Sequence, residues 1–142
     1  MAKYIIDTNT SIEYFKHRHG VAEHMSQVNR DDICVSEVTN AELLYGAMHS
    51  KSVNRHLREV RELQRDISVL PISDCLDDYA EIRHSLASQG LTVEDFDILI
   101  GATARHYGLI AVTDILEHFN RMSGVQTEDT NDLKKNIWIG ML

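Results

Sequence analysis

The first fifteen residues, Met1-Ala-Lys-Tyr-Ile-Ile-Asp-Thr-Asn-Thr-Ser-Ile-Glu-Tyr-Phe15, change in character at Asp7. The Tyr and Ile residues before Asp7 favour a β-strand, because branched and aromatic side chains fit the pleated surface of a sheet. The Asp, Thr, Asn and Ser residues that follow favour turns and helix N-termini, where short side-chain oxygens bond to backbone amides. The stretch therefore predicts a strand that ends at Asp7 and a helix that begins near Asn9. Asp7 is then either a helix cap or a group at the sheet edge where α/β proteins bind ligands.

The rest of the chain alternates between strand-type and helix-type segments. Apolar runs of strand type occupy residues 33–36, 67–72 and 109–113. We expect helices over residues 11–18, 37–48, 51–66 and 76–88. A further helix is expected to be capped by Thr92, to carry residues 97–105 and to end at Gly108, and a short helix to run through Phe119. This order predicts an α/β fold, a three-layer α/β/α sandwich with a mostly parallel central sheet. No linker or repeat divides the chain, so we expect a single domain over residues 1–142.

The segment 51–66 is strongly amphipathic. Its apolar residues, from Val53 to Leu63, fall on one face, and five basic residues gather on the opposite face: Lys51, Arg55, Arg58, Arg61 and Arg65. This basic face is a candidate RNA contact. The alternative is a solvated face, because Glu62 stands at helical spacing from Arg58 and Arg65, and this alternative is favoured for the residues taken singly.

The overall charge limits the classes of function. The chain has 14 Lys and Arg against 22 Asp and Glu, a net charge of −8. Such acidity argues against passive binding to nucleic acid, which calls for a basic surface, but not against a nuclease whose acids hold metal. No apolar run is long enough to span a membrane, and no signal peptide is evident. Cys34 and Cys75 show no metal or redox spacing, so we expect a cytoplasmic protein.

Four carboxylates occupy comparable places in the predicted fold. Asp7 and Asp114 each follow a strand, Glu42 lies in the helix after residues 33–36, on or near its core-facing side, and Asp97 opens the most apolar helix. In a parallel sheet, the segments that follow the strands all start at the same edge of the sheet. We therefore expect the four acids to meet at that edge. Clustered carboxylates repel one another unless a cation is present, and oxygen ligands suit Mg²⁺ or Mn²⁺. Such an ion supports hydrolysis of a phosphodiester.

Each of these residues also has a purely structural interpretation. Asp7 and Asp114 are suited to helix capping, and Asp97 to a place in the first turn, where it would complement the helix dipole. Asp95 fits that first-turn role better, which leaves Asp97 for ligand binding. The polar residues Thr8, Asn9 and Thr113 either orient water or phosphate at the metal or satisfy the backbone at strand ends. We expect His118 to face solvent.

The motifs together resemble the PIN domains, and more narrowly the VapC-type toxins of bacterial toxin–antitoxin pairs. The resemblance rests on Lys3-Tyr-Ile-Ile-Asp-Thr-Asn9, Thr39-Asn-Ala-Glu-Leu-Leu-Tyr-Gly-Ala47, Asp97-Ile-Leu-Ile-Gly-Ala-Thr-Ala104, and Val112-Thr113 with His118-Phe119. It implies a Mg²⁺ or Mn²⁺ dependent endoribonuclease, inhibited by a cognate VapB-type antitoxin and usually a homodimer. It also implies metal-site roles for Asp7, Glu42 and Asp97. In many relatives the fourth ligand stands two residues after the threonine, at the position of Ile115 here, whereas Asp114 stands one residue after it.

Other α/β proteins begin in a similar way. A phosphatase of the HAD type uses a strand-end aspartate as its nucleophile, but it has Asp or Thr where this chain has Asn9 and it needs a later lysine. A receiver domain is a phosphoacceptor module that pairs two acids after its first strand, where this chain has Asp-Thr. A catalytically inactive PIN-like binding module is the third alternative. Trapping of a phosphoenzyme on Asp7 would favour the phosphatase. Phosphorylation without RNA cleavage would favour the receiver domain.

Overall fold

The sheet has five strands and confirms the expected α/β architecture. The structure is a computed structural model that describes residues 2–12, 30–113 and 115–129. The strands lie in the order β3-β2-β1-β4-β5, and every neighbouring pair is parallel. Their bounds are Tyr4–Ile6 for β1, Ile33–Ser36 for β2, Ser68–Leu70 for β3, Ile110–Thr113 for β4 and Gln126–Asp129 for β5.

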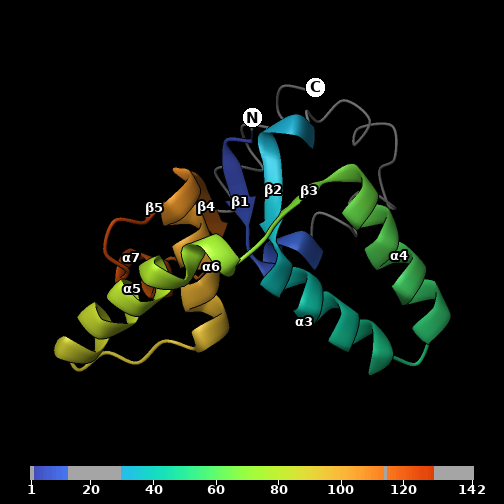
Figure 1. Cartoon of the computed structure of the whole chain (residues 1–142). Coiled ribbons are helices and arrows are strands. Elements are labelled where there is room, and N and C mark those ends of the chain that lie inside the picture. Colours follow the sequence, from blue (N-terminus) through green and yellow to red (C-terminus); the bar gives the residue numbers. More distant parts are fainter. Residues whose placement is uncertain (1, 13–29, 114, 130–142) are drawn as a thin grey trace.

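Helices cover both faces of this sheet, as Figure 1 shows, with α4 on one side and α5, α6 and α7 on the other. The helices are α3 (Glu37–Met48), α4 (Val53–Asp66), α5 (Leu76–Ser88), α6 (Asp95–Tyr107) and α7 (Leu116–Asn120). Two single turns, η1 (Arg30–Asp32) and η2 (Ser73–Cys75), and a helical stretch at residues 8–12 complete the described part. Within it, no helix has the length and apolar character needed to cross a membrane.

Strand β1 lies at the centre and contributes to two hydrophobic cores. Successive side chains of a strand point to opposite faces. Ile5 packs in the core that α5, α6 and α7 cover, together with Ile98 and Phe119. Ile6 packs in the core on the other face, together with Leu63 of α4. Both isoleucines are almost completely buried, so the position of the residue that follows them is determined by both layers.

The strand order reverses between β1 and β4. From β1 the chain moves outward to β2 and β3, and it then crosses back to β4 and β5 on the other side of β1. In open α/β sheets, ligands bind in the crevice beyond the carboxyl ends of the strands at such a reversal point. The residues that end β1 and β4 therefore occupy the favoured position for a functional site.

Helix α3 differs from its expected packing. Of the residues at helical spacing, Val38 is buried, but Ala41 is exposed and the Tyr45 side chain is 68% exposed. The helix instead packs through Val38, Thr39, Leu43 and Ala47, because α4 lies beside it and its first residues contact the sheet. Its outer face therefore carries apolar side chains in contact with solvent.

Candidate functional site

Asp7 joins the end of β1 to the end of β4. Its carboxylate Oδ1 accepts a hydrogen bond from the Thr10 backbone N–H at 2.9 Å, and its Oδ2 accepts one from the Thr113 hydroxyl at 2.6 Å. The side chain is buried, with 4% of the residue exposed. The bond to Thr10 is the helix cap that the sequence predicted, and the bond to Thr113 is an additional one across the reversal point. Capping and a place at the ligand edge are thus compatible at this residue.

Glu42 reaches the same edge from α3. The helix starts directly after β2, where the Ser36 hydroxyl accepts a hydrogen bond from the Val38 backbone N–H at 3.2 Å. One and a half turns later, the Glu42 Oε1 accepts a hydrogen bond from the Thr8 hydroxyl at 2.6 Å. Because Thr8 directly follows Asp7 in the chain, this bond brings the Glu42 carboxylate to the residue next to Asp7. The expectation that Glu42 lies toward the core-facing side agrees with this contact.

Asp97 lies in the first turn of α6 and contacts α7. Its Oδ2 is 3.3 Å from Nδ1 of His118, and both side chains are partly exposed. The His118 side chain is partly exposed beside the buried Phe119, as expected, but its contact with Asp97 was not predicted. The sequence could not place this histidine, because the contact depends on how α6 and α7 pack against each other. Its position shortly after the end of β4 was the only signal available.

The remaining predicted residues differ in their positions. Thr8 and Thr113 donate to the carboxylates of Glu42 and Asp7, whereas Asn9 is exposed to solvent. Asp114 lies outside the described residues. The five basic residues of the predicted basic face, Lys51, Arg55, Arg58, Arg61 and Arg65, are all exposed and do not join the carboxylates.

The donor chemistry at this edge suits a hard divalent cation. Carboxylate oxygens, with hydroxyl groups beside them, are the ligands that Mg²⁺ and Mn²⁺ prefer. Three of the four predicted metal ligands lie in the described residues, and each contacts a different polar side chain. Asp7 contacts Thr113, Glu42 contacts Thr8 and Asp97 contacts His118. In the described ranges, no three His, Cys, Asp or Glu side chains lie close enough together to hold one ion. Shared coordination of one ion by these residues therefore stays a prediction.

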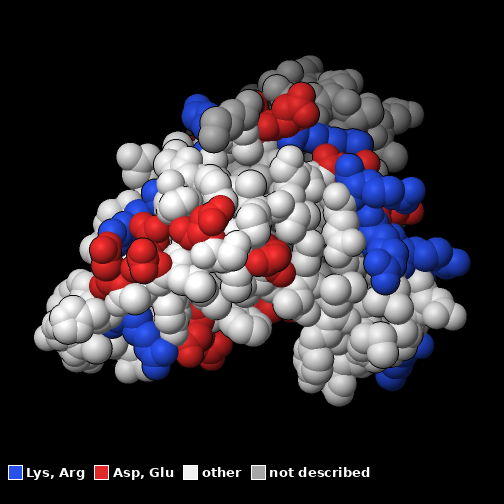
Figure 2. Space-filling model, in the orientation of Figure 1, with Lys and Arg blue, Asp and Glu red and all other residues white. Residues whose placement is uncertain are grey.

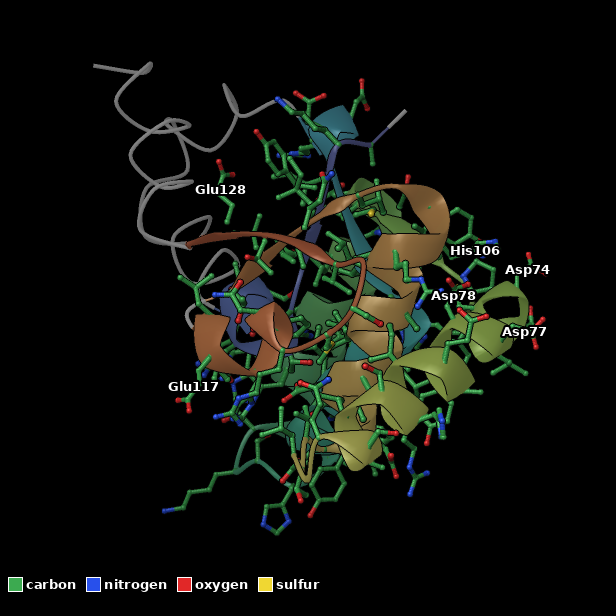
Figure 3. The ribbon with its side chains drawn as sticks, turned by 90° about the vertical axis from the view of Figure 1, so that its left-hand side faces the viewer. Asp74, Asp77, Asp78, His106, Glu117 and Glu128 are labelled. Carbon is green, nitrogen blue, oxygen red and sulfur yellow. The ribbon has the colours of Figure 1, made fainter. Side chains whose placement is uncertain are left out.

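A second group of acids, around the start of α5, has a structural role. In Figure 3, Asp78 on α5 and His106 on α6 point toward one another. Asp78 lies 3.0 Å from His106 Nδ1 and 3.1 Å from Arg105 Nε, and Arg105 also pairs with Glu81. These contacts join α5 to α6 and distinguish this group from the carboxylates at the strand ends.

Residues 4–116 match the PIN domain family. The chain belongs to this family. This PIN domain is 35% identical over 130 residues to the tRNA(fMet)-specific endonuclease VapC of Shigella flexneri, covering 91% of the chain and 98% of that protein. It is 33% identical over 132 residues to Ribonuclease VapC2 of Haemophilus influenzae, with 91% and 98% covered. The crystal structure of DNA-bound VapBC from Salmonella typhimurium superposes with a TM-score of 0.81 at 32% identity, covering 92% of this chain and 99% of that one.

The family match bears on the alternatives considered for the sequence. It spans Asp7, Glu42 and Asp97, together with the threonines that bond to two of them. Membership of the PIN domain family replaces the phosphatase and receiver interpretations of the opening strand.

Proposed function

We propose that this protein is the toxin of a toxin–antitoxin pair, an endoribonuclease that hydrolyses RNA phosphodiester bonds with Mg²⁺ or Mn²⁺. Asp7, Glu42 and Asp97 would hold the ion, and Asp114 is a candidate fourth ligand. The observation that supports the proposal is a pair of hydrogen bonds at the carboxyl end of β1, one from Thr113 to Asp7 and one from Thr8 to Glu42. The VapC ribonucleases to which the chain is similar support the type of reaction.

The protein's own groups supply position and charge. The Thr113 hydroxyl and the Thr10 N–H fix both oxygens of Asp7 at the end of β1. The Thr8 hydroxyl contacts Glu42, and the His118 ring contacts Asp97. When bound, a divalent ion supplies a Lewis acid for the phosphate and offsets the negative charge that develops on its oxygens.

The substrate and partners follow from the relatives. We infer that the RNA is a tRNA, with the initiator tRNA(fMet) as the first candidate, because the Shigella flexneri relative is named for it. A VapB-type antitoxin is the expected inhibitor, since solved relatives are VapBC complexes. The groove between residues 8–12, α3 and α4, lined by apolar residues that include Leu43, Ala47 and Val60, offers such a partner a surface. The protein is expected to act in the cytoplasm, as a homodimer.

The deciding experiment is cleavage of transcribed tRNA(fMet) by the purified protein with Mg²⁺ or Mn²⁺. The Asp97→Asn variant tests the site, and Asp95→Asn is a matched control, because Asp95 lies two residues earlier in α6 and pairs with Arg83 on α5 instead. We expect discrete cuts by the wild type and the control, none by Asp97→Asn, and none with a chelator.

Two results would contradict the proposal. Cleavage by Asp97→Asn at the wild-type rate would remove Asp97 from the site. A folded wild-type protein, freed of bound inhibitor, that cuts neither tRNA(fMet) nor a mixed pool of cellular RNA would favour the inactive binding module.

A further inference from the structure

The outer face of α4 carries a group of exposed guanidinium groups, here called the arginine face and formed by Arg58, Arg61 and Arg65. Together with Glu62 and Gln64, these residues line a shallow hollow. Figure 2 shows basic side chains gathered over α4, whereas acidic side chains gather over the side of α5 and α6. On this side of the molecule, α4 therefore carries a concentration of basic side chains.

The arginine face is not neutralised by the carboxylates around it. In α4, Arg55 pairs with Glu59 at 3.9 Å, and Asp66 pairs with Arg30 at 3.6 Å. Within residues 2–12, 30–113 and 115–129, no ion pair involves the three residues of the arginine face. This occurs in a chain with 22 acidic and 14 basic side chains, where acidic partners are in excess. The three charges therefore remain available to an anion outside the chain.

The spacing of the three residues suits a polyanion. Residues at i, i+3 and i+7 of a helix project from the same side. At 1.5 Å per residue, the interval from residue 58 to residue 65 extends about 10 Å along α4. Stacked nucleotides rise about 3.4 Å each, so this length corresponds to roughly three nucleotides of one strand. Arginine also binds phosphate with two parallel hydrogen bonds, which gives the contact a defined geometry.

The arginine face lies away from the carboxylates. The opposite side of α4, with Val60 and Leu63, packs toward α3 and residues 8–12. A helix with its side chains is about 10 Å across, so the arginine face stands at least one helix diameter beyond the residues that follow Asp7. An RNA that contacts both places must therefore extend well beyond the bond that is cut.

We infer that the arginine face binds the phosphate backbone of a folded RNA at a distance from the cleaved bond and holds it on the enzyme. The inference rests on the proposed ribonuclease function and adds the surface that offsets the net charge of −8 toward a polyanion. Binding energy from a remote part of the substrate that is equal before and during the reaction lowers KM and leaves kcat unchanged.

The test compares two triple variants of the full chain in binding to transcribed tRNA(fMet). The first is Arg58→Gln with Arg61→Gln and Arg65→Gln. The control changes the net charge equally at three other places, with Lys3→Gln, Arg83→Gln and Arg121→Gln. Dissociation constants are measured in chelator at several salt concentrations, so that no cleavage occurs and the result is independent of nuclease activity. Circular dichroism confirms that both variants fold.

We expect the arginine-face variant to bind tRNA about 10- to 100-fold more weakly than the wild type, and the control to differ only slightly. The slope of log affinity against log salt should fall by about 1 for each arginine removed. In cleavage assays the variant should raise KM for tRNA and keep kcat. Equal losses in both triple variants would assign the effect to net charge and overturn the inference. Unchanged tRNA binding, with loss of co-purification of the cognate antitoxin, would overturn it by assigning the arginines to that protein.

Discussion

The hydrogen bond from Thr113 to Asp7 gives a quantitative test of the site's construction. Replacing Thr113 by Val keeps the shape of a fully buried side chain and removes its hydroxyl. That hydroxyl donates to the Asp7 carboxylate at 2.6 Å and accepts from the Ile115 backbone N–H at 2.9 Å. A hydrogen bond to a charged group contributes about 1.5–3 kcal/mol, and a backbone N–H left without a partner costs about 1–3 kcal/mol.

Part of this loss is offset, because Val adds one buried methyl group worth about 0.8 kcal/mol. We therefore expect Thr113→Val to lower the free energy of unfolding by about 3 kcal/mol, which for a chain of this size lowers Tm by about 5–10 °C. Urea and thermal unfolding, followed by circular dichroism, measure both quantities. Cleavage should fall as well, because one oxygen of Asp7 loses the group that orients it.

The matched control is Thr103→Val. Thr103 is equally buried, but its hydroxyl donates to the neutral Leu99 carbonyl of its own helix at 2.8 Å. Its replacement should cost about 1 kcal/mol or less. If Thr113→Val is no more destabilising than Thr103→Val, the bond to Asp7 does not hold the ends of β1 and β4 together, and the reasoning is refuted.

Three further predictions concern the cysteine, the glycines and the toxicity. Burial raises the pKa of the Cys34 thiol from about 9 to about 12. Between these two pH values the Cys34 thiol ionises only in the unfolded chain, so the free energy of unfolding should fall as pH rises. Urea unfolding at several pH values measures this fall, which should be smaller in Cys34→Ala. Gly46→Ala should raise the free energy of unfolding by about 0.5–1 kcal/mol, because nothing lies within 4 Å of the added Cβ. Gly108→Ala should lower it by about 1 kcal/mol, because Gly108 has a φ of +66°. A loss of stability in Gly46→Ala would contradict this reasoning. Induced expression of the wild type should arrest growth of a bacterial host, and Asp97→Asn should not; equal arrest by both would separate toxicity from the proposed site.

The sequence predicted well those features that depend on short-range pattern. Residues 33–36 and Leu76–Ser88 have the predicted bounds, because apolar periodicity and the flanking residues act locally. The place of Asp7 was also predictable, since the change from strand-type to cap-type residues marks the end of β1. Parallel pairing then follows from the alternation of strands and helices.

The features that the sequence did not predict depend on contacts between distant segments. The spacing of Ala41 and Tyr45 marks a helix but does not reveal which side of α3 meets α4 and the sheet. The His118 contact with Asp97 joins residues on two helices whose packing no local pattern encodes. The bonds from Thr8 to Glu42 and from Thr113 to Asp7 were likewise beyond the sequence, which indicated polar groups at strand ends without assigning partners.

The central place of β1 has a consequence for synthesis of the protein on the ribosome. Strand β1 leaves the ribosome before the other strands of the sheet, and its pairing partner on one side, β4, is made about a hundred residues later, because Tyr4 pairs with Ile110. The bond between Thr113 and Asp7 spans 106 positions of the chain. Domains fold when their long-range contacts become available, so the edge that carries Asp7 cannot assemble until β4 has emerged. A chain that stops before β4 therefore lacks the bond between Thr113 and Asp7, and the proposed site is complete only after β4 has been made.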